Sequence, residues 1–178
     1  MKRIVAMLAL VACAVLGAAQ TQWVAFPDSF NLSSASARQP LRTLFFEDGE
    51  GMTLLPLKQQ GPVQEMGIEL AGHNAMGVRP YTMTFSMGDA VAPGAILGRR
   101  VEFFNFATNS WEVVLRTKAN GQGPDGLLTW TEVTVKAGSF VNAKTGEFRT
   151  RVYWNSVGQL SPVWIDQAGW VMTSHWRG

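Results

Sequence analysis

The sequence predicts an all-β protein, a single antiparallel β-sandwich of jelly-roll type. Short runs rich in Val, Phe, Thr, Trp and Leu are separated by Gly, Pro, Asn and Asp, which is the pattern of strands and turns. No segment places apolar residues at helical spacing over three turns. Many short strands at spacings of roughly 8 to 15 residues indicate two packed antiparallel sheets.

Length and charge narrow the class of protein. The chain has 178 residues, 47% of them apolar and 16% charged, as expected for one globular domain. Its formal net charge is +2, and Lys2 and Arg3 supply two of the positive charges. The rest of the chain is close to neutral and has no basic stripe, so we expect no nucleic-acid partner.

The first 19 residues have the features of a signal peptide. Met1, Lys2 and Arg3 form a positive start, residues 4–16 are apolar, and residues 17–19 are the small residues that signal peptidase requires. The apolar run is shorter than the roughly 20 residues needed to span a bilayer, and no later stretch is long enough. We therefore expect a β-sandwich domain over residues 20–178, secreted or periplasmic, with no membrane span.

Cys13 is the only cysteine and lies inside the apolar run. Residues 10–13 are similar to a bacterial lipobox, in which this cysteine would carry a lipid anchor. We favour an ordinary signal peptide, because the sequence stays apolar after Cys13 as far as Ala19. The domain then contains no cysteine and depends on its own core for stability.

The strands can be placed in order along the chain. Residues 22–40 are interpreted as one edge strand and a loop, and residues 44–46 and 52–55 as a hairpin around the Asp-Gly turn at 47–51. The remaining strands are expected at 66–70, 81–87, 101–106, 111–115, 127–135, 147–154, 163–166 and 170–173. Segment 147–154 alternates most clearly: Phe148, Thr150, Val152 and Trp154 share one face, and Glu147, Arg149, Arg151 and Tyr153 the other.

Three stretches of the second half resemble a known module. They are VEFFNFATNSWE at 101–112, GEFRTRVYW at 146–154 and WIDQAGW at 164–170. Residues 81–175 resemble the C-terminal β-sandwich modules of uncharacterised secreted proteins from environmental bacteria, which are similar to galactose-binding-like jelly rolls. The resemblance implies a noncatalytic extracellular domain and carries over no catalytic residues.

Catalytic motifs are not evident. His73 and His175 lack zinc-ligand spacing, and no Gly-x-Ser-x-Gly elbow is present. A glycosidase needs two facing carboxyl groups, and the sequence pairs none of its candidates, which are Glu102, Glu112, Glu132 and Asp166. Asp166 interrupts an apolar run, so it either accepts hydrogen bonds from loop amides or ligates a cation.

Calcium is a separate alternative. Residues 47–50 carry three carboxylates but not the ligand spacing of a recognised calcium loop, which favours a simple turn. We expect no cofactor, and a metal site is left open.

The aromatic residues give the strongest functional indication. Trp111 and Trp154 align with apolar neighbours and are expected in the core. Trp130, Tyr153 and Trp164 fall on the polar face of their strands. A flat ring with polar neighbours suits a sugar ring, so the predicted ligand-binding residues are Trp130, Tyr153, Trp164, Arg149 and Arg151. The alternative is that these rings pack under loops.

These observations favour a secreted, noncatalytic β-sandwich that binds carbohydrate or a cell-envelope polymer. A structural or adhesion module that contacts surface proteins is the alternative, and an exported hydrolase is the third interpretation.

Overall fold

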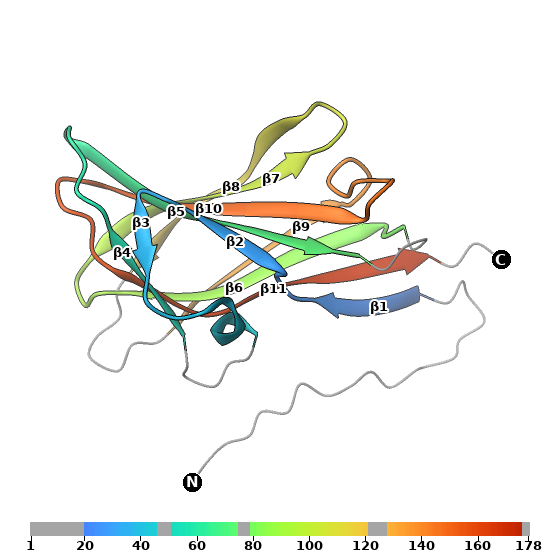
Figure 1. Ribbon diagram of the computed structural model, residues 1–178, viewed down its shortest axis with the longest axis horizontal. Coiled ribbons are helices and arrows are strands. Elements are labelled where there is room, and N and C mark those ends of the chain that lie inside the picture. The colour runs from blue at the N-terminus through green and yellow to red at the C-terminus, as the bar shows by residue number, and fades with distance from the viewer. Residues whose placement is uncertain (1–19, 46–50, 75–78, 121–127, 176–178) are drawn as a thin grey trace, which may run out of the picture.

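The computed structural model describes residues 20–45, 51–74, 79–120 and 128–175, which form two antiparallel sheets packed face to face (Figure 1). The six-stranded sheet has the order β3-β4-β11-β6-β9, with β1 added beside β11. The five-stranded sheet has the order β2-β5-β10-β7-β8. The predicted all-β sandwich is confirmed.

Each sheet is built from strands that are far apart in the sequence. The six-stranded sheet contains β1 (Gln20–Ala25), β3 (Ala35–Ala37), β4 (Met52–Pro56), β6 (Thr82–Val91), β9 (Thr129–Lys136) and β11 (Val163–His175). The five-stranded sheet contains β2 (Ser29–Ser33), β5 (Val63–His73), β7 (Ile96–Asn105), β8 (Ser110–Asn120) and β10 (Glu147–Val157).

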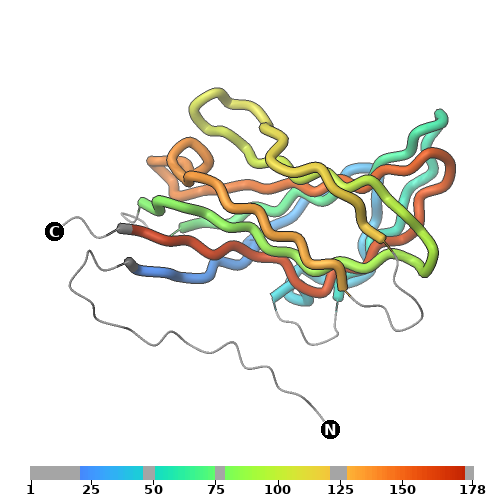
Figure 2. Tube along the Cα trace, turned by 180° about the vertical axis from the view of Figure 1, so that it is seen from behind, coloured from blue at the N-terminus to red at the C-terminus, as the bar shows by residue number. Residues whose placement is uncertain are grey.

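The pairing is that of a jelly roll. Strand β4 pairs with β11, β5 with β10, β6 with β9, and β7 with β8, so the chain folds back on itself as four nested antiparallel pairs. The C-terminal strand β11 therefore lies inside its sheet, between β1 and β6 (Figure 2). Strand β10 occupies the corresponding inner position in the other sheet.

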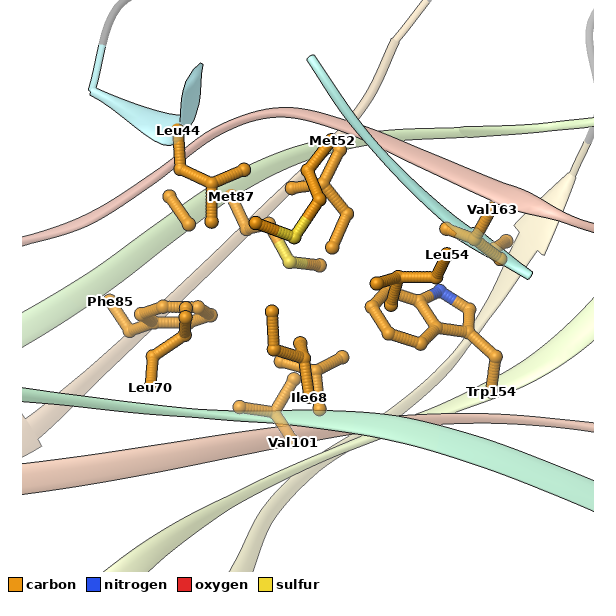
Figure 3. Packing of buried hydrophobic residues seen from close by; sticks show 14 of the residues in the cluster. Leu44, Met52, Leu54, Ile68, Leu70, Phe85, Met87, Val101, Trp154 and Val163 are labelled. Carbon is orange, nitrogen blue, oxygen red and sulfur yellow. The ribbon is translucent and has the colours of Figure 1, made fainter. Parts of the chain in front are cut away.

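The core lies between the sheets (Figure 3). Ile68 and Trp154 from the five-stranded sheet face Met52, Met87 and Val163 from the six-stranded sheet, and all five are at most 1% exposed. The inward positions alternate along the strands as the sequence pattern requires. The prediction that Trp154 is a core residue is confirmed.

Polar groups also connect the two sheets. The Asp89 carboxylate of β6 accepts a hydrogen bond from Trp154 Nε1 at 2.7 Å and pairs with the buried Arg99 guanidinium of β7. Burial raises the pKa of Asp89, while the charge of Arg99 and the Trp154 hydrogen bond act in the opposite direction. Trp170 Nε1 donates to Thr150 Oγ1 at 2.9 Å. Both indole N–H groups are thus satisfied by the opposite sheet.

The N-terminal part differs from the prediction. Residues 22–40 contain three strands instead of one, and Leu41–Leu44 is a 3-10 helix (η1), so Leu44 belongs to this helix and not to the strand expected at 44–46. Pro40, with φ −74°, precedes this turn, and Leu44 is fully buried. Strand β4 pairs with β3 and β11, and not with Leu44 or Phe45, the described residues of the strand expected at 44–46. The expected turn and the calcium alternative at 47–50 lie outside the described residues.

Two β-bulges explain the other differences. The β7–β8 hairpin is confirmed, but its register shifts so that Val101 pairs with Leu115 and Glu102 with Val113. The extra residue reverses which side chains face outward, so Trp111 lies on the outer surface instead of in the core. A second bulge between Ile165 and Gln167 joins the two expected strands at 163–166 and 170–173 into one.

Candidate functional site

The five predicted ligand-binding residues divide between the two outer faces of the sandwich. Tyr153, Arg149 and Arg151 project from β10 on the outer face of the five-stranded sheet. Trp130 on β9 and Trp164 on β11 lie on the outer face of the six-stranded sheet. The fold therefore does not gather the five into one site, and each face is described separately.

The tryptophan face is the outer surface around Trp130 and Trp164. Trp130 pairs with Gly88 and Trp164 with Ala90 on the strand that lies between them, β6. Two strand spacings across the sheet and two residues along β6 place the two Cα atoms about 12 Å apart. Gly88 and Ala90 of β6 lie between the two Cα atoms, and the Leu128 side chain also lies close to Gly88.

Glycines set the orientation of both indoles. A Cβ added at Gly51 would overlap Trp164 Cε2 and Nε1, which places that ring directly over the glycine. A Cβ at Gly88 would lie 3.3 Å from Trp130 Cζ2. Side chains on the outer face of a sheet otherwise stand upright, so the missing Cβ atoms allow these rings to lie close to the strands.

The outer surfaces of these rings have no aromatic or cationic neighbour within the described part of the chain. Trp130 is 44% exposed and Trp164 is partly exposed. Polar groups lie on the same face: Gln167 pairs with Gly88, and Glu132 is exposed two residues from Trp130 on β9. The outward Thr84 and Thr134 hydroxyls, hydrogen-bonded at 2.8 Å, lie two residues further along β6 and β9. The tryptophan face thus combines flat apolar rings with amide and hydroxyl groups and one carboxylate.

The arginine–tyrosine face is the outer surface of the five-stranded sheet around Tyr153. A Cβ at Gly67 would lie 2.5 Å from Tyr153 Cδ1, so this ring also lies over a glycine. Here, however, guanidinium groups contact the ring: Arg100 Cζ is 4.7 Å and Arg151 Cζ 5.3 Å from its centroid. Arg151 also lies 4.2 Å from the centroid of Trp111.

Glu102 holds this arrangement together. It is 5% exposed, its Oε1 lies 2.7 Å from Arg100 Nε, and its Oε2 accepts a hydrogen bond from Arg151 Nε. Arg100 also lies 3.2 Å from Glu65, and Arg149 lies 2.5 Å from Glu147. The rings and charges of this face are therefore already engaged with one another.

The sequence did not identify Arg100, Glu102 and Trp111 as members of this face. Arg149, Arg151 and Tyr153 were found because one strand's alternation reveals them. The other three come from β7 and β8, and they join the group only through the β10–β7 register and the bulge in β8. The alternation within a single strand does not show which strands pair, and that pairing is needed to find these three residues.

The candidate glycosidase carboxylates are dispersed. Glu102 and Glu132 lie on opposite outer faces, and Asp166 is buried at the β11 bulge. Glu112 accepts a hydrogen bond from Asn105 Nδ2 at 2.6 Å. These four residues form no facing pair across a cleft.

Neither the histidines nor the carboxylates form a metal site within the described ranges. His73 Nδ1 lies 2.8 Å from Asp28 Oδ2, and both side chains are exposed; the His175 side chain lies outside the described part. Within the described ranges no group of three or more His, Cys, Asp or Glu side chains could hold a metal ion. None of the helices described there is long and apolar enough to cross a membrane.

No protein-family model and no curated protein matches this sequence. Several solved structures are similar in fold. A family 29 carbohydrate-binding module from Piromyces equi has 8% identity and a TM-score of 0.48, over 86% of this chain and 90% of its own. The module TmCBM61, solved with β-1,4-galactotriose, has 9% identity and a TM-score of 0.46, over 84% and 90%.

A cyclase from Fischerella sp. TAU is also similar, with 17% identity and a TM-score of 0.44, over 71% of this chain and 64% of its own. These likenesses concern the fold alone, and the functional argument rests on the side chains described above.

Proposed function

We propose that this protein is an exported, noncatalytic carbohydrate-binding module that holds a neutral polysaccharide on its tryptophan face. The observation that carries the proposal is the pair of outward indoles, seated over Gly51 and Gly88, of which Trp130 is 44% exposed and Trp164 partly exposed. The C–H groups on one side of a pyranose ring are weakly positive, and they are attracted to the negative face of an aromatic ring.

The surroundings of the indoles support a neutral, extended ligand. With Cα atoms about 12 Å apart, the two tryptophans can contact separate sugar units of one chain. Hydroxyl and amide groups, such as those of Thr84 and Gln167, can exchange hydrogen bonds with sugar hydroxyls. Export by the segment at 1–19 belongs to the same proposal.

The test is depletion of the purified domain from solution by insoluble cellulose, chitin, xylan and peptidoglycan, followed by tryptophan fluorescence with the retaining polymer. Trp130→Ala and Trp164→Ala should each weaken retention about tenfold, equivalent to ~1.4 kcal/mol. Tyr81→Ala is the matched control, because Tyr81 is an exposed aromatic residue away from both indoles. Retention unchanged in both tryptophan variants would refute the site. A folded protein that no polymer retains would instead favour the adhesion alternative.

A further inference from the structure

The arginine–tyrosine face contains a depression that the proposed function does not use. It has a volume of about 90 Å³ and is lined by residues of β2, β5 and β10, Tyr153 among them. Its other lining residues include Arg151, Asn31, Ser33 and Glu69, which carry hydrogen-bond donors and acceptors. Donors and acceptors therefore surround a space that is open beside an aromatic ring.

The size of the depression limits what it can accept. Sites that enclose a small molecule usually have about 300–1,000 Å³, so this depression can take only an edge of a sugar, such as a hydroxyl or hydroxymethyl group. The rest of the sugar would lie on the surrounding surface. A site of this kind suits one unit of a long chain that lies across the sheet.

The charges of this face favour an uncharged ligand. Arg100 is paired with Glu65 and Glu102, and Arg151 with Glu102. Glu102 thereby fixes both guanidinium groups before any ligand arrives. Because the carboxylates balance these cations, the face offers little net attraction to an anionic polymer, whereas Glu69 and Arg151 can still hydrogen-bond sugar hydroxyls.

We propose that the arginine–tyrosine face is a second binding surface for neutral polysaccharide, so that one domain holds two chains and cross-links them. This inference rests on the proposed function of the tryptophan face. The two surfaces are the opposite outer faces of two stacked sheets, so a chain lying flat on one cannot also lie on the other.

The test measures binding and cross-linking separately, with soluble galactomannan, xylan and mixed-linkage β-glucan as probes. Binding is measured by retardation in gels that contain each polymer, and cross-linking by light scattering of polymer–protein mixtures. The wild-type domain should raise scattering at low protein-to-polymer ratios and lose it in protein excess. Scattering is lost in protein excess because each polymer chain is then occupied by separate domains, and the second face of each domain finds no free chain to bind.

Tyr153→Ala and Asn31→Ala remove the ring and one lining group. Asn31 is exposed on β2, so its variant keeps the test valid if Tyr153→Ala does not fold. Each should reduce scattering at least tenfold while gel retardation falls only about twofold, since one of two surfaces remains. Thr117→Ala, an exposed position on β8, is the control and should match the wild type.

Three results would overturn the inference. If Tyr153→Ala and Asn31→Ala scatter as the wild type does, the second surface is not used. If the wild-type domain is retarded in the gels but does not raise light scattering, and only Trp130→Ala and Trp164→Ala abolish retardation, the proposed function stands. The inference of a second binding surface then fails. If the wild type is retarded by none of the three polymers, both fail together.

Discussion

On the outer face of the five-stranded sheet Tyr153 lies over Gly67, and on that of the six-stranded sheet Trp164 lies over Gly51. The two faces thus share one construction, an aromatic ring on a strand glycine. They differ in what contacts the ring. Arg100 and Arg151 lie against Tyr153 and are fixed by Glu102, whereas none of the described side chains makes a ring or cation contact with Trp164.

This difference decides how much each ring contributes to stability before a ligand binds. An aromatic ring already in contact with guanidinium groups contributes to the folded state before any ligand binds. An uncovered ring contributes little until something stacks on it. Substitutions on the arginine–tyrosine face should therefore affect folding more strongly than matched substitutions on the tryptophan face.

The largest loss of stability is expected for a substitution in the core between the two sheets that carry these faces. Arg99→Leu leaves Asp89 buried without its counter-charge and should lower the free energy of unfolding by about 3–5 kcal/mol at neutral pH. Losing the guanidinium raises the pKa of Asp89 further above 3.8, its value before burial. When the pKa of a carboxyl group is higher in the folded protein than in the unfolded chain, its contribution to the free energy of unfolding is fully present below pH 3.8. That contribution is lost as the pH rises through the pKa of the folded protein.

The cost of Arg99→Leu should accordingly be larger at pH 7 than at pH 4, as measured by urea unfolding at both values. Arg116→Leu, at an exposed position on β8, is the control. Equal losses in the two variants, or a loss that does not grow with pH, would contradict the role of this ion pair in joining the sheets.

The glycines beside Tyr153 and Trp130 allow these two rings to be compared at the same chemical change, whereas Gly51, where a Cβ would lie 2.6 Å from the Ile165 carbonyl oxygen, is as crowded as Gly67. In Gly67→Ala the new Cβ would lie 2.5 Å from Tyr153 Cδ1 and 2.8 Å from the Val152 carbonyl oxygen. Overpacking of this kind costs about 1–3 kcal/mol. In Gly88→Ala the nearest atoms are 3.3 Å away, so stability should change by less than about 0.5 kcal/mol. Thermal unfolding of both variants measures the difference, and equal melting temperatures would refute it.

The carboxylates provide a further matched pair. Glu102→Gln keeps the shape of the side chain but removes the charge that holds Arg100 and Arg151, and it should cost about 1–2 kcal/mol. Glu132→Gln, on the exposed outer face of the other sheet, should stay within about 0.5 kcal/mol. Urea unfolding and near-ultraviolet circular dichroism would detect the loss and the release of the rings. A stability change at Glu132 as large as at Glu102 would show that the two faces do not differ in this way.

Local alternation was sufficient to predict the sandwich. The faces of β10 were assigned correctly because Phe148 and Trp154 alternate with Arg149 and Tyr153, and a period of two determines which side chains point inward. The jelly-roll class followed from the number and spacing of such strands. This information is local, and each strand carries it without reference to its partner.

Register and bulges are not local, and they account for what the sequence missed. Trp111 was placed in the core because its strand was read as regular, and a single extra residue in β8 puts it outside. The predicted ligand-binding set was divided for the same kind of reason. Trp164 and Tyr153 are both polar-face aromatics in their strands, but only strand pairing decides to which sheet each strand belongs.

The smallest effect is expected on the tryptophan face, at the hydroxyl pair that Thr84 and Thr134 form across β6 and β9. Both hydroxyls are exposed, so water can replace the lost partner when Thr84 is changed to Val. Valine is also well suited to a strand, and the free energy of unfolding should change by less than about 0.5 kcal/mol. Urea unfolding of Thr84→Val beside Glu102→Gln measures this directly. A loss above about 1 kcal/mol would mean that polar groups on the tryptophan face also maintain the fold, which would remove the distinction between a face whose side chains stabilise the fold and a face whose side chains do not.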